Sequence, residues 1–305
     1  MRTSRMLALG ALLLALLGAC STGGGSKPTI KIGSDDFYEA KIVGEIYAQA
    51  LEASGYGVDR AGFGLGGRDV SAPALESGQI DLKPEYIGSG VAHYDPSKQS
   101  GDPAAEKAAL QAILAGKGGG ITVLDYASAA DQNGFVVRAE TASQFNLTKL
   151  SDLTQVQDQI KFGLALQCPT NPVCGPALMS AYGFTQQTID NATLLAACSQ
   201  PMVDALAAKT IDLGELCTTQ PDIAKNGWVL LTDDKSTQPA DNLVPLVRND
   251  YLAKVDRAAF SKILNDVSAK LTTPGLLDLN RQFVFDKKEI ADIAKGWLTQ
   301  NGFLH

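Results

Sequence analysis

Short apolar runs alternate with longer amphipathic stretches along most of the chain. The short runs predict strands at 29–33, 58–63, 80–83, 121–124, 134–138, 161–166, 193–196, 212–216, 228–231 and 243–247. The stretches between them predict helices at 69–76, 102–114, 150–159, 175–182, 201–208 and 221–226. The segment 250–304 reads as largely helical, with one break at Pro274 and Gly275. Alternation of this kind is typical of parallel α/β layers.

A further helix is predicted directly after the first strand. Asp36 and Glu39 stand three residues apart, which is the pattern of a capping box. Apolar residues then recur at helical spacing until two glycines end the pattern, and they are Phe37, Ile42, Val43, Ile46, Ala50 and Leu51.

The N-terminal stretch predicts export. Two arginines precede an apolar run at 6–17, which is typical of a secretory signal and short for a membrane span. The run ends in a Leu-Gly-Ala-Cys sequence that resembles the bacterial lipobox, so we expect a signal peptide at 1–19 and a lipid on Cys20. A glycine-rich flexible tether at 20–28 follows. The predicted location is extracytoplasmic, on the outer face of the bacterial cytoplasmic membrane; the alternative is an ordinary signal peptide with an incidental cysteine.

Charge and histidine content exclude several kinds of function. The formal net charge is −7 and no cluster of basic residues occurs, so a nucleic-acid partner is not expected. The histidines are His93 and His305, so histidine-based catalysis or a zinc site would have to be built around His93 alone. We expect no metal and no cofactor.

Four cysteines follow Cys20, an even number in a chain predicted to be exported. Three pairings are possible. Cys168 and Cys174 enclose a short loop with two prolines, which favours a pairing of Cys168 with Cys174 and of Cys198 with Cys217. No Cys-x-x-Cys spacing is present, so a structural role is favoured over a redox role.

Residues 62–67 match the G-x-G-x-x-G pattern of dinucleotide-binding loops, and Asp81 lies near the distance expected of a ribose-binding acid. An exported protein meets no cytoplasmic pool of NAD. We therefore interpret these glycines as a tight loop at the N-terminus of a helix.

Three blocks of sequence resemble one known family. They are Gly33-Ser34-x-x-Phe37-x-Glu39, then Gly66-Gly67 with Ala74-Leu75-x-x-Gly78-x-Ile80-Asp81, then Pro84-Glu85-Tyr86-x-Gly88-Ser89. Together they resemble the osmoprotectant branch of ABC-importer substrate-binding proteins, whose ligands include glycine betaine, choline and carnitine. The likeness continues more loosely through 131–137 and 230–235 to Trp297 and Leu298.

The resemblance implies an α/β fold of two lobes joined by two crossovers, with the ligand in the cleft between them. We expect lobe one at 27–127 plus 242–305 and lobe two at 128–241. The function implied is capture of a small polar solute and its delivery to an ABC permease with its ATPase. A monomer is expected.

The family usually surrounds a quaternary ammonium group with tyrosines. Tyr86 matches one wall of that cage, and Ser89 matches a hydroxyl that commonly contacts the ligand's carboxylate. The resemblance implies two further tyrosines, but Asn133 occupies the position of the second, and Cys217 or its neighbour occupies the position of the third. Asp241 precedes Asn242 where the family commonly has Tyr-Asn. The ligand-binding residues expected are Ser34, Asp35, Asp36, Phe37, Tyr86, Ser89, Asn133, Thr218, Asp241 and Asn242.

These departures favour a ligand with hydroxyls or primary amines over glycine betaine, because the replacing groups form hydrogen bonds. Two alternatives stay open. One is an exported hydrolase that works through Asp35, Asp36, Glu85 and Asp241. The other is a receptor of the same fold that senses its ligand without transporting it.

Overall fold

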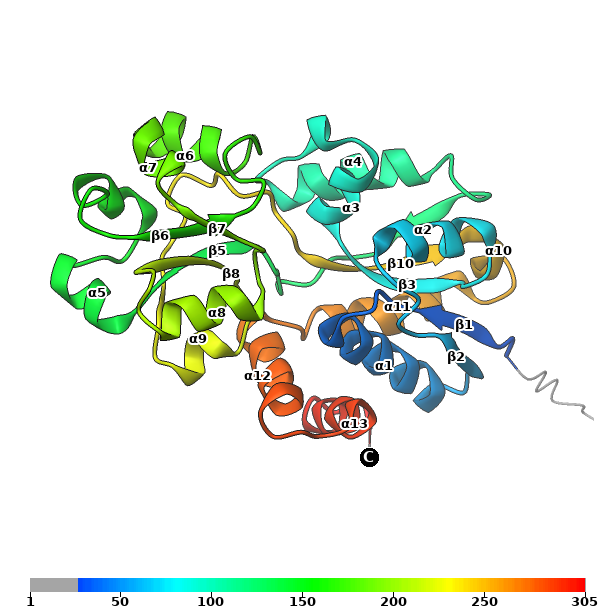
Figure 1. Cartoon of the computed structure of the whole chain (residues 1–305). Helices are drawn as coiled ribbons and strands as arrows, with labels where there is room; N and C mark the ends of the chain where they lie inside the picture. The colour runs from blue at the N-terminus through cyan, green and yellow to red at the C-terminus, as the bar shows by residue number, and fades with distance from the viewer. Residues whose placement is uncertain (1–26, 305) are drawn as a thin grey trace, which may run out of the picture.

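A computed structural model describes residues 27–304, which form two α/β lobes side by side (Figure 1). The signal peptide and Cys20 lie outside the described residues. Each lobe is built on a five-stranded sheet with helices packed around it, and the strand orders are β2-β1-β3-β10-β4 and β7-β6-β8-β5-β9. Within residues 27–304, no helix has both the length and the apolar character needed to span a membrane.

Lobe one contains the first four strands and the last one. The strands are β1 (Ile30–Gly33), β2 (Val58–Gly62), β3 (Leu82–Tyr86), β4 (Ile121–Val123) and β10 (Leu243–Arg248). Its helices are α1 (Tyr38–Ala53), α2 (Arg68–Ser77), α3 (Ile87–Tyr94), α4 (Pro103–Leu114), α10 (Asn249–Leu252), α11 (Arg257–Ser268), α12 (Thr273–Val284) and α13 (Ile290–Gln300), with a 3-10 turn at Pro96–Lys98.

Lobe two is formed by the middle of the chain. Its strands are β5 (Asn133–Val137), β6 (Phe162–Ala165), β7 (Thr193–Leu195), β8 (Leu213–Cys217) and β9 (Val229–Leu230). Its helices are α5 (Ala139–Phe145), α6 (Gly175–Tyr182), α7 (Gln186–Asp190), α8 (Gln200–Ala207) and α9 (Asp222–Lys225), with a 3-10 segment at Leu150–Gln155.

Both sheets are mixed, so the prediction of parallel layers is correct for β1 with β2 and β3 and for β6 with β7 and β8, but wrong for β10 and β5. The antiparallel strand of each sheet is the one that directly follows a crossover. In lobe one β10 is antiparallel to β3 and β4, and in lobe two β5 is antiparallel to β8 and β9. Apolar periodicity marks a buried strand but does not give its direction.

The two crossover segments that join the lobes are bonded to each other. The Leu243 amide donates to the Ala129 carbonyl at 2.9 Å, and the Asp131 amide donates to the Asp241 carbonyl at 3.1 Å. This pairing places Asp131 and Asp241 next to each other between the lobes. We propose that lobe one comprises 27–127 plus 242–305 and lobe two 128–241, because the chain changes sheet within these crossovers.

The lobes have separate hydrophobic cores. In lobe one, α1 packs between the sheet and the C-terminal helices, with Ile42, Val43 and Ile46 fully buried. The apolar spacing predicted for this helix is thus its buried face. The predicted capping box is wrong: the cap of α1 is Phe37 without a side-chain bond, and Asp36 pairs instead with Lys41 at 2.7 Å.

Two disulfides lie in lobe two. They join Cys168 to Cys174 and Cys198 to Cys217, which is the pairing expected from the sequence. Cys217 is the last residue of β8, so the second disulfide ties the end of that strand to the loop before α8.

The glycine-rich segment 62–67 connects β2 to α2. Gly64 and Gly66 have φ angles of +68° and +136°, which only glycine adopts readily. The loop is held by lobe one itself, because the Gly64 amide donates to Ser34 Oγ and the Gly66 carbonyl accepts from the Asp36 amide.

Candidate ligand-binding cleft

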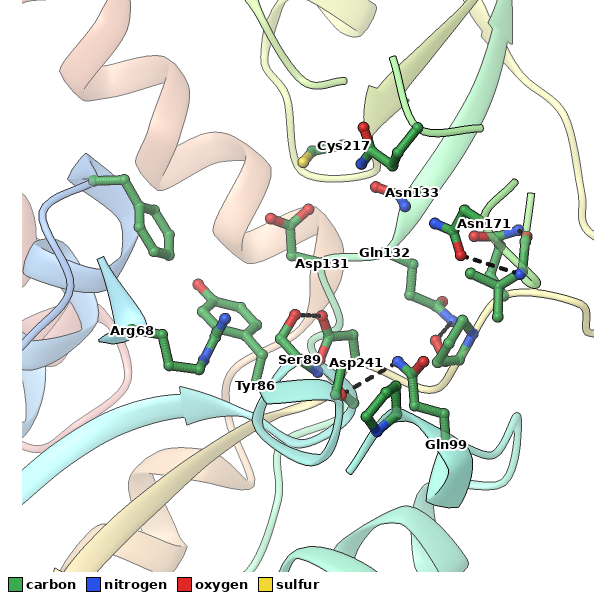
Figure 2. A pocket seen from close by; sticks show the side chains of 18 residues that line it. Arg68, Tyr86, Ser89, Gln99, Asp131, Gln132, Asn133, Asn171, Cys217 and Asp241 are labelled. Carbon is green, nitrogen blue, oxygen red and sulfur yellow. Dashed lines mark hydrogen bonds between the residues drawn. The ribbon is translucent and has the colours of Figure 1, made fainter. Parts of the chain in front are cut away.

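A cavity of about 560 Å³ lies between the lobes. Lobe one provides Phe37, Arg68, Tyr86, Gly88, Ser89, Ala92, Pro96 and Gln99; the two crossovers provide Asp131, Gln132 and Asp241; and the rest of lobe two provides Asn133, Gln167, Asn171, Val173, Cys217, Gln238 and Pro239. Figure 2 shows Tyr86, Ser89 and Asp241 on one side, Asn133 and Cys217 on the other, and Asp131 between them. A solute in this cavity would contact both lobes.

Asp241 is held at the N-terminus of α3. Its carboxylate accepts from the Ser89 amide at 2.8 Å and from Ser89 Oγ at 2.7 Å (Figure 2). Free amides at the first turn of a helix favour an anion, so α3 fixes this carboxylate in the wall of the cavity. The close approach needs Gly88, because a Cβ there would lie 2.6 Å from the Ala240 carbonyl oxygen.

The carboxylates of the cleft resist ionisation. Burial, only partly offset by the Ser89 hydrogen bonds, raises the pKa of Asp241 to about 6. Burial and the neighbouring Glu39 raise the pKa of Asp131 well above its usual range, and Asp241 adds to the effect. Burial therefore outweighs the partial compensation that the positive charge of Arg68 gives Asp241.

Two aromatic rings face the cavity beside these acids. The rings of Phe37 and Tyr86 are 5.9 Å apart between centroids. The Tyr86 hydroxyl donates to the buried carboxylate of Glu39, which also accepts from the Asn280 side-chain amide. The same Asn280 amide donates to the Thr219 carbonyl of lobe two at 3.1 Å, so this buried network connects the two lobes.

Arg68 lies at the edge of the cavity and is paired within lobe one. Its guanidinium donates through Nε and Nη2 to Glu85, with Nη2 2.8 Å from Oε1. The fully buried Lys83 lies 2.8 Å from Asp35 and 2.9 Å from Glu85. Burial opposes ionisation of Glu85, yet Lys83 and Arg68 together lower its pKa to about 2. Two cations and two carboxylates thus neutralise one another under the cleft.

Five of the residues expected from the sequence line the cavity: Phe37, Tyr86, Ser89, Asn133 and Asp241.

The other five lie outside it. Asp35 is buried against Lys83, Asp36 is exposed beside Lys41, and Ser34 is buried with its hydroxyl bonded to backbone. Thr218 faces a smaller neighbouring pocket. Asn242 donates to the Ala127 carbonyl at 2.9 Å and so supports the crossover.

Arg68, Asp131 and several amide side chains also line the cavity, although the sequence did not predict them as ligand-binding residues; the amides are Gln99, Gln132, Gln167, Asn171 and Gln238. A signal existed for two of them. Arg68 directly follows the Gly66-Gly67 block, and Asp131 begins the block that contains Asn133. The amides lie in loops and crossovers whose contacts depend on how the lobes are placed.

Residues 28–300 match the family described as the substrate-binding domain of ABC-type glycine betaine transport systems. The chain belongs to this family. It is 28% identical over 308 residues to the glycine betaine-binding protein YehZ of Escherichia coli K12, covering 98% of this chain and 99% of that protein. It is 26% identical over 295 residues to the carnitine transport binding protein OpuCC of Listeria monocytogenes, covering 94% and 92%.

A solved structure supports the same architecture. The crystal structure of a glycine betaine/carnitine/choline ABC transporter matches with a TM-score of 0.78 at 20% identity, over 90% of this chain and 99% of that one. The expected two-lobed α/β fold and the expected family are therefore confirmed. This member of the family is a substrate-binding protein of an osmoprotectant ABC importer, and its homologues are transport binding proteins.

Replacement of Lys83 by methionine should destabilise this substrate-binding protein strongly. The change leaves Asp35 and Glu85 buried with only Arg68 to compensate them, so we expect a loss of about 3–5 kcal/mol in the free energy of unfolding. Lys107→Met is the control, because Lys107 pairs with the exposed Asp125 at 3.0 Å and should cost less than about 1 kcal/mol. Urea denaturation at neutral pH measures both; equal losses would contradict the described network.

Proposed function

We propose that this protein captures a small cationic solute with N–H donors and delivers it to an ABC permease driven by its ATPase. Membership of the family supports the transport role. The ligand class rests on one observation: the carboxylates of Asp131 and Asp241 face the cleft beside the rings of Phe37 and Tyr86. An ammonium group there would add positive charge beyond the partial compensation by Arg68.

The position of Ser89 supports a cation over a betaine. The resemblance implies that the hydroxyl of Ser89 contacts the ligand's carboxylate. Here the amide and the hydroxyl of Ser89 both donate to the carboxylate of Asp241 in the protein itself. Arg68 also lines the cavity, but its Nε and Nη2 are bonded to Glu85. The cleft therefore contains a built-in carboxylate, and a ligand carboxylate would meet it as a like charge.

The polar walls favour N–H donors over methyl groups. A quaternary ammonium binds through aromatic faces because it has no donor. Asn133, Cys217 and Asp241 provide no such faces, whereas carboxylates and amide oxygens accept hydrogen bonds from a primary or secondary ammonium. Phe37 and Tyr86 remain available for cation–π contact.

Closure of the lobes is the proposed mechanism of capture. A solute bound to Asp241 of one crossover, Asp131 of the other and Asn133 of lobe two would stabilise the closed arrangement, which the permease then recognises. The ligand leaves unchanged, so no catalysis is proposed. The alternative of a hydrolase would use Asp35 and Glu85, but these carboxylates form ion pairs with Lys83 and Arg68. Sensing without transport would use the same cleft.

The protein is proposed to act as a monomer outside the cytoplasm, attached through a lipid on Cys20. The lipobox-like sequence before Cys20 supports this location. Cys20→Ala should move the protein from the membrane fraction to the soluble or secreted fraction, because the lipid is the proposed anchor. Immunoblots of fractionated cells measure the shift. Cys198→Ser is a control that retains Cys20, and membrane attachment of Cys20→Ala at the wild-type level would refute the anchor.

Binding of ethanolamine, used as a simple ammonium probe, should depend on pH through Asp241. Only the ionised carboxylate attracts the cation, and the pKa of Asp241 is about 6. Titration of Asp241 should thus lower the affinity by about tenfold for each pH unit below about 6. Calorimetry in two buffers of different ionisation enthalpy at pH 6 should also detect proton release. Constant affinity between pH 5 and 8 would contradict the role of Asp241.

The Asp241→Asn variant is the matched control. It should bind ethanolamine about tenfold to a hundredfold more weakly at pH 8 and lose the pH dependence near 6. The unliganded wild type should show the opposite trend in stability. The pKa of Asp241 is higher in the folded state than in the unfolded one, so its contribution to stability is present at low pH and is lost as pH rises to about 6.

A further inference from the structure

A second, smaller cavity adjoins the main one between the lobes. This side chamber has a volume of about 290 Å³ and is lined by Phe37, Tyr38, Glu39, Asp131, Cys198, Cys217, Thr219 and Gln220. Phe37, Asp131 and Cys217 line both spaces, so they form the boundary between the main cavity and the side chamber. Asp131, the proposed ammonium acceptor, therefore stands where a ligand would pass from one space into the other.

Most of the chamber wall is apolar. The rings of Phe37 and Tyr38 lie on the lobe-one side, and the Cys198–Cys217 disulfide lies on the lobe-two side. Tyr38 is fixed from behind by Phe283, whose ring stacks on it with centroids 5.5 Å apart. Such walls favour carbon atoms of a ligand over water.

One polar group in the chamber wall lacks a partner. Gln220 is 8% exposed, and its buried side-chain oxygen Oε1 has no hydrogen-bond partner within residues 27–304. A buried amide without a partner is costly, and native proteins normally satisfy it. The amide thus marks the chamber as a place where a hydrogen-bonding group of a ligand would be stabilised.

We propose that the side chamber is a second subsite, which binds an arm of the ligand made of a few apolar carbons and a terminal hydroxyl. This inference rests on the proposed function, because the ammonium at Asp131 anchors the arm. The ligand class becomes an amino alcohol longer than ethanolamine: the ammonium pairs with Asp131 and Asp241, the carbons contact Phe37 and the disulfide, and the hydroxyl bonds Gln220.

The contributions of the ammonium, the carbons and the hydroxyl can be compared by measuring the affinities of three probes, by calorimetry on the full-length protein at pH 8. Ethanolamine has the ammonium without the arm, aminopentanol has both, and hexylamine has an arm of the same length without the hydroxyl. Aminopentanol should bind about tenfold or more tightly than ethanolamine, because its added methylenes leave water. It should bind about fivefold more tightly than hexylamine, because only its hydroxyl can bond the amide.

The Gln220→Met variant tests the assignment of the amide. It keeps the length of the side chain, so ethanolamine affinity should not change, while the preference for aminopentanol over hexylamine should disappear. Gln167→Met is the matched control, since Gln167 lines the main cavity and not the side chamber; it should keep the preference. Gln220→Met should be at least as stable as the wild type, because the buried Oε1 has no partner to lose.

The outcomes distinguish this subsite from the proposed function. If none of the three amines binds, the cationic ligand class is wrong and the subsite falls with it. If ethanolamine binds and the longer probes bind no more tightly, the ligand class stands and the subsite is refuted. Loss of the hydroxyl preference in Gln167→Met as well as in Gln220→Met would place the arm in the main cavity and overturn the assignment.

Discussion

Carboxylates that are held away from water need a positive charge or a proton, and this requirement governs the cleft. Under the cleft floor the requirement is met within the protein, because Lys83 and Arg68 compensate Asp35 and Glu85. In the cleft itself it is met only in part, because the positive charge of Arg68 favours ionisation of Asp241 without offsetting its burial. Burial raises the pKa of Asp131 and of Asp241, and the charge they lack is what a bound cation would provide.

The topology brings these two acids together. One crossover leaves lobe one after β4 and the other returns before β10, and their backbone hydrogen bond joins Asp131 to Asp241. The start of α3 then fixes Asp241 through Ser89, while Glu39, Tyr86 and Asn280 connect the cleft floor to the Thr219 carbonyl of lobe two. Groups that would bind the solute thus lie on the segments that would bend when the lobes close.

The sequence predicts the lobes better than it predicts the cleft. Apolar periodicity depends on each segment alone, so the buried face of α1 and most strands can be read from spacing. The antiparallel direction of β5 and β10 cannot be predicted from spacing, because strand direction depends on the whole path of the chain. Glu39 shows the same limit: its spacing from Asp36 indicates a local cap, but tertiary contacts draw it to Tyr86 and Asn280.

The sequence blocks that resemble the family identify the cleft residues they contain, such as Tyr86 and Ser89. They do not show that Ser89 bonds Asp241, which is distant in sequence and decides the charge of the site. The direct test of this built-in carboxylate is the affinity of ethanolamine and its successive N-methyl derivatives up to choline, measured by calorimetry at pH 8. Affinity should fall with each N–H that is replaced, and choline should bind about tenfold or more weakly than ethanolamine. Choline or glycine betaine binding more tightly than ethanolamine would contradict a carboxylate-based cleft.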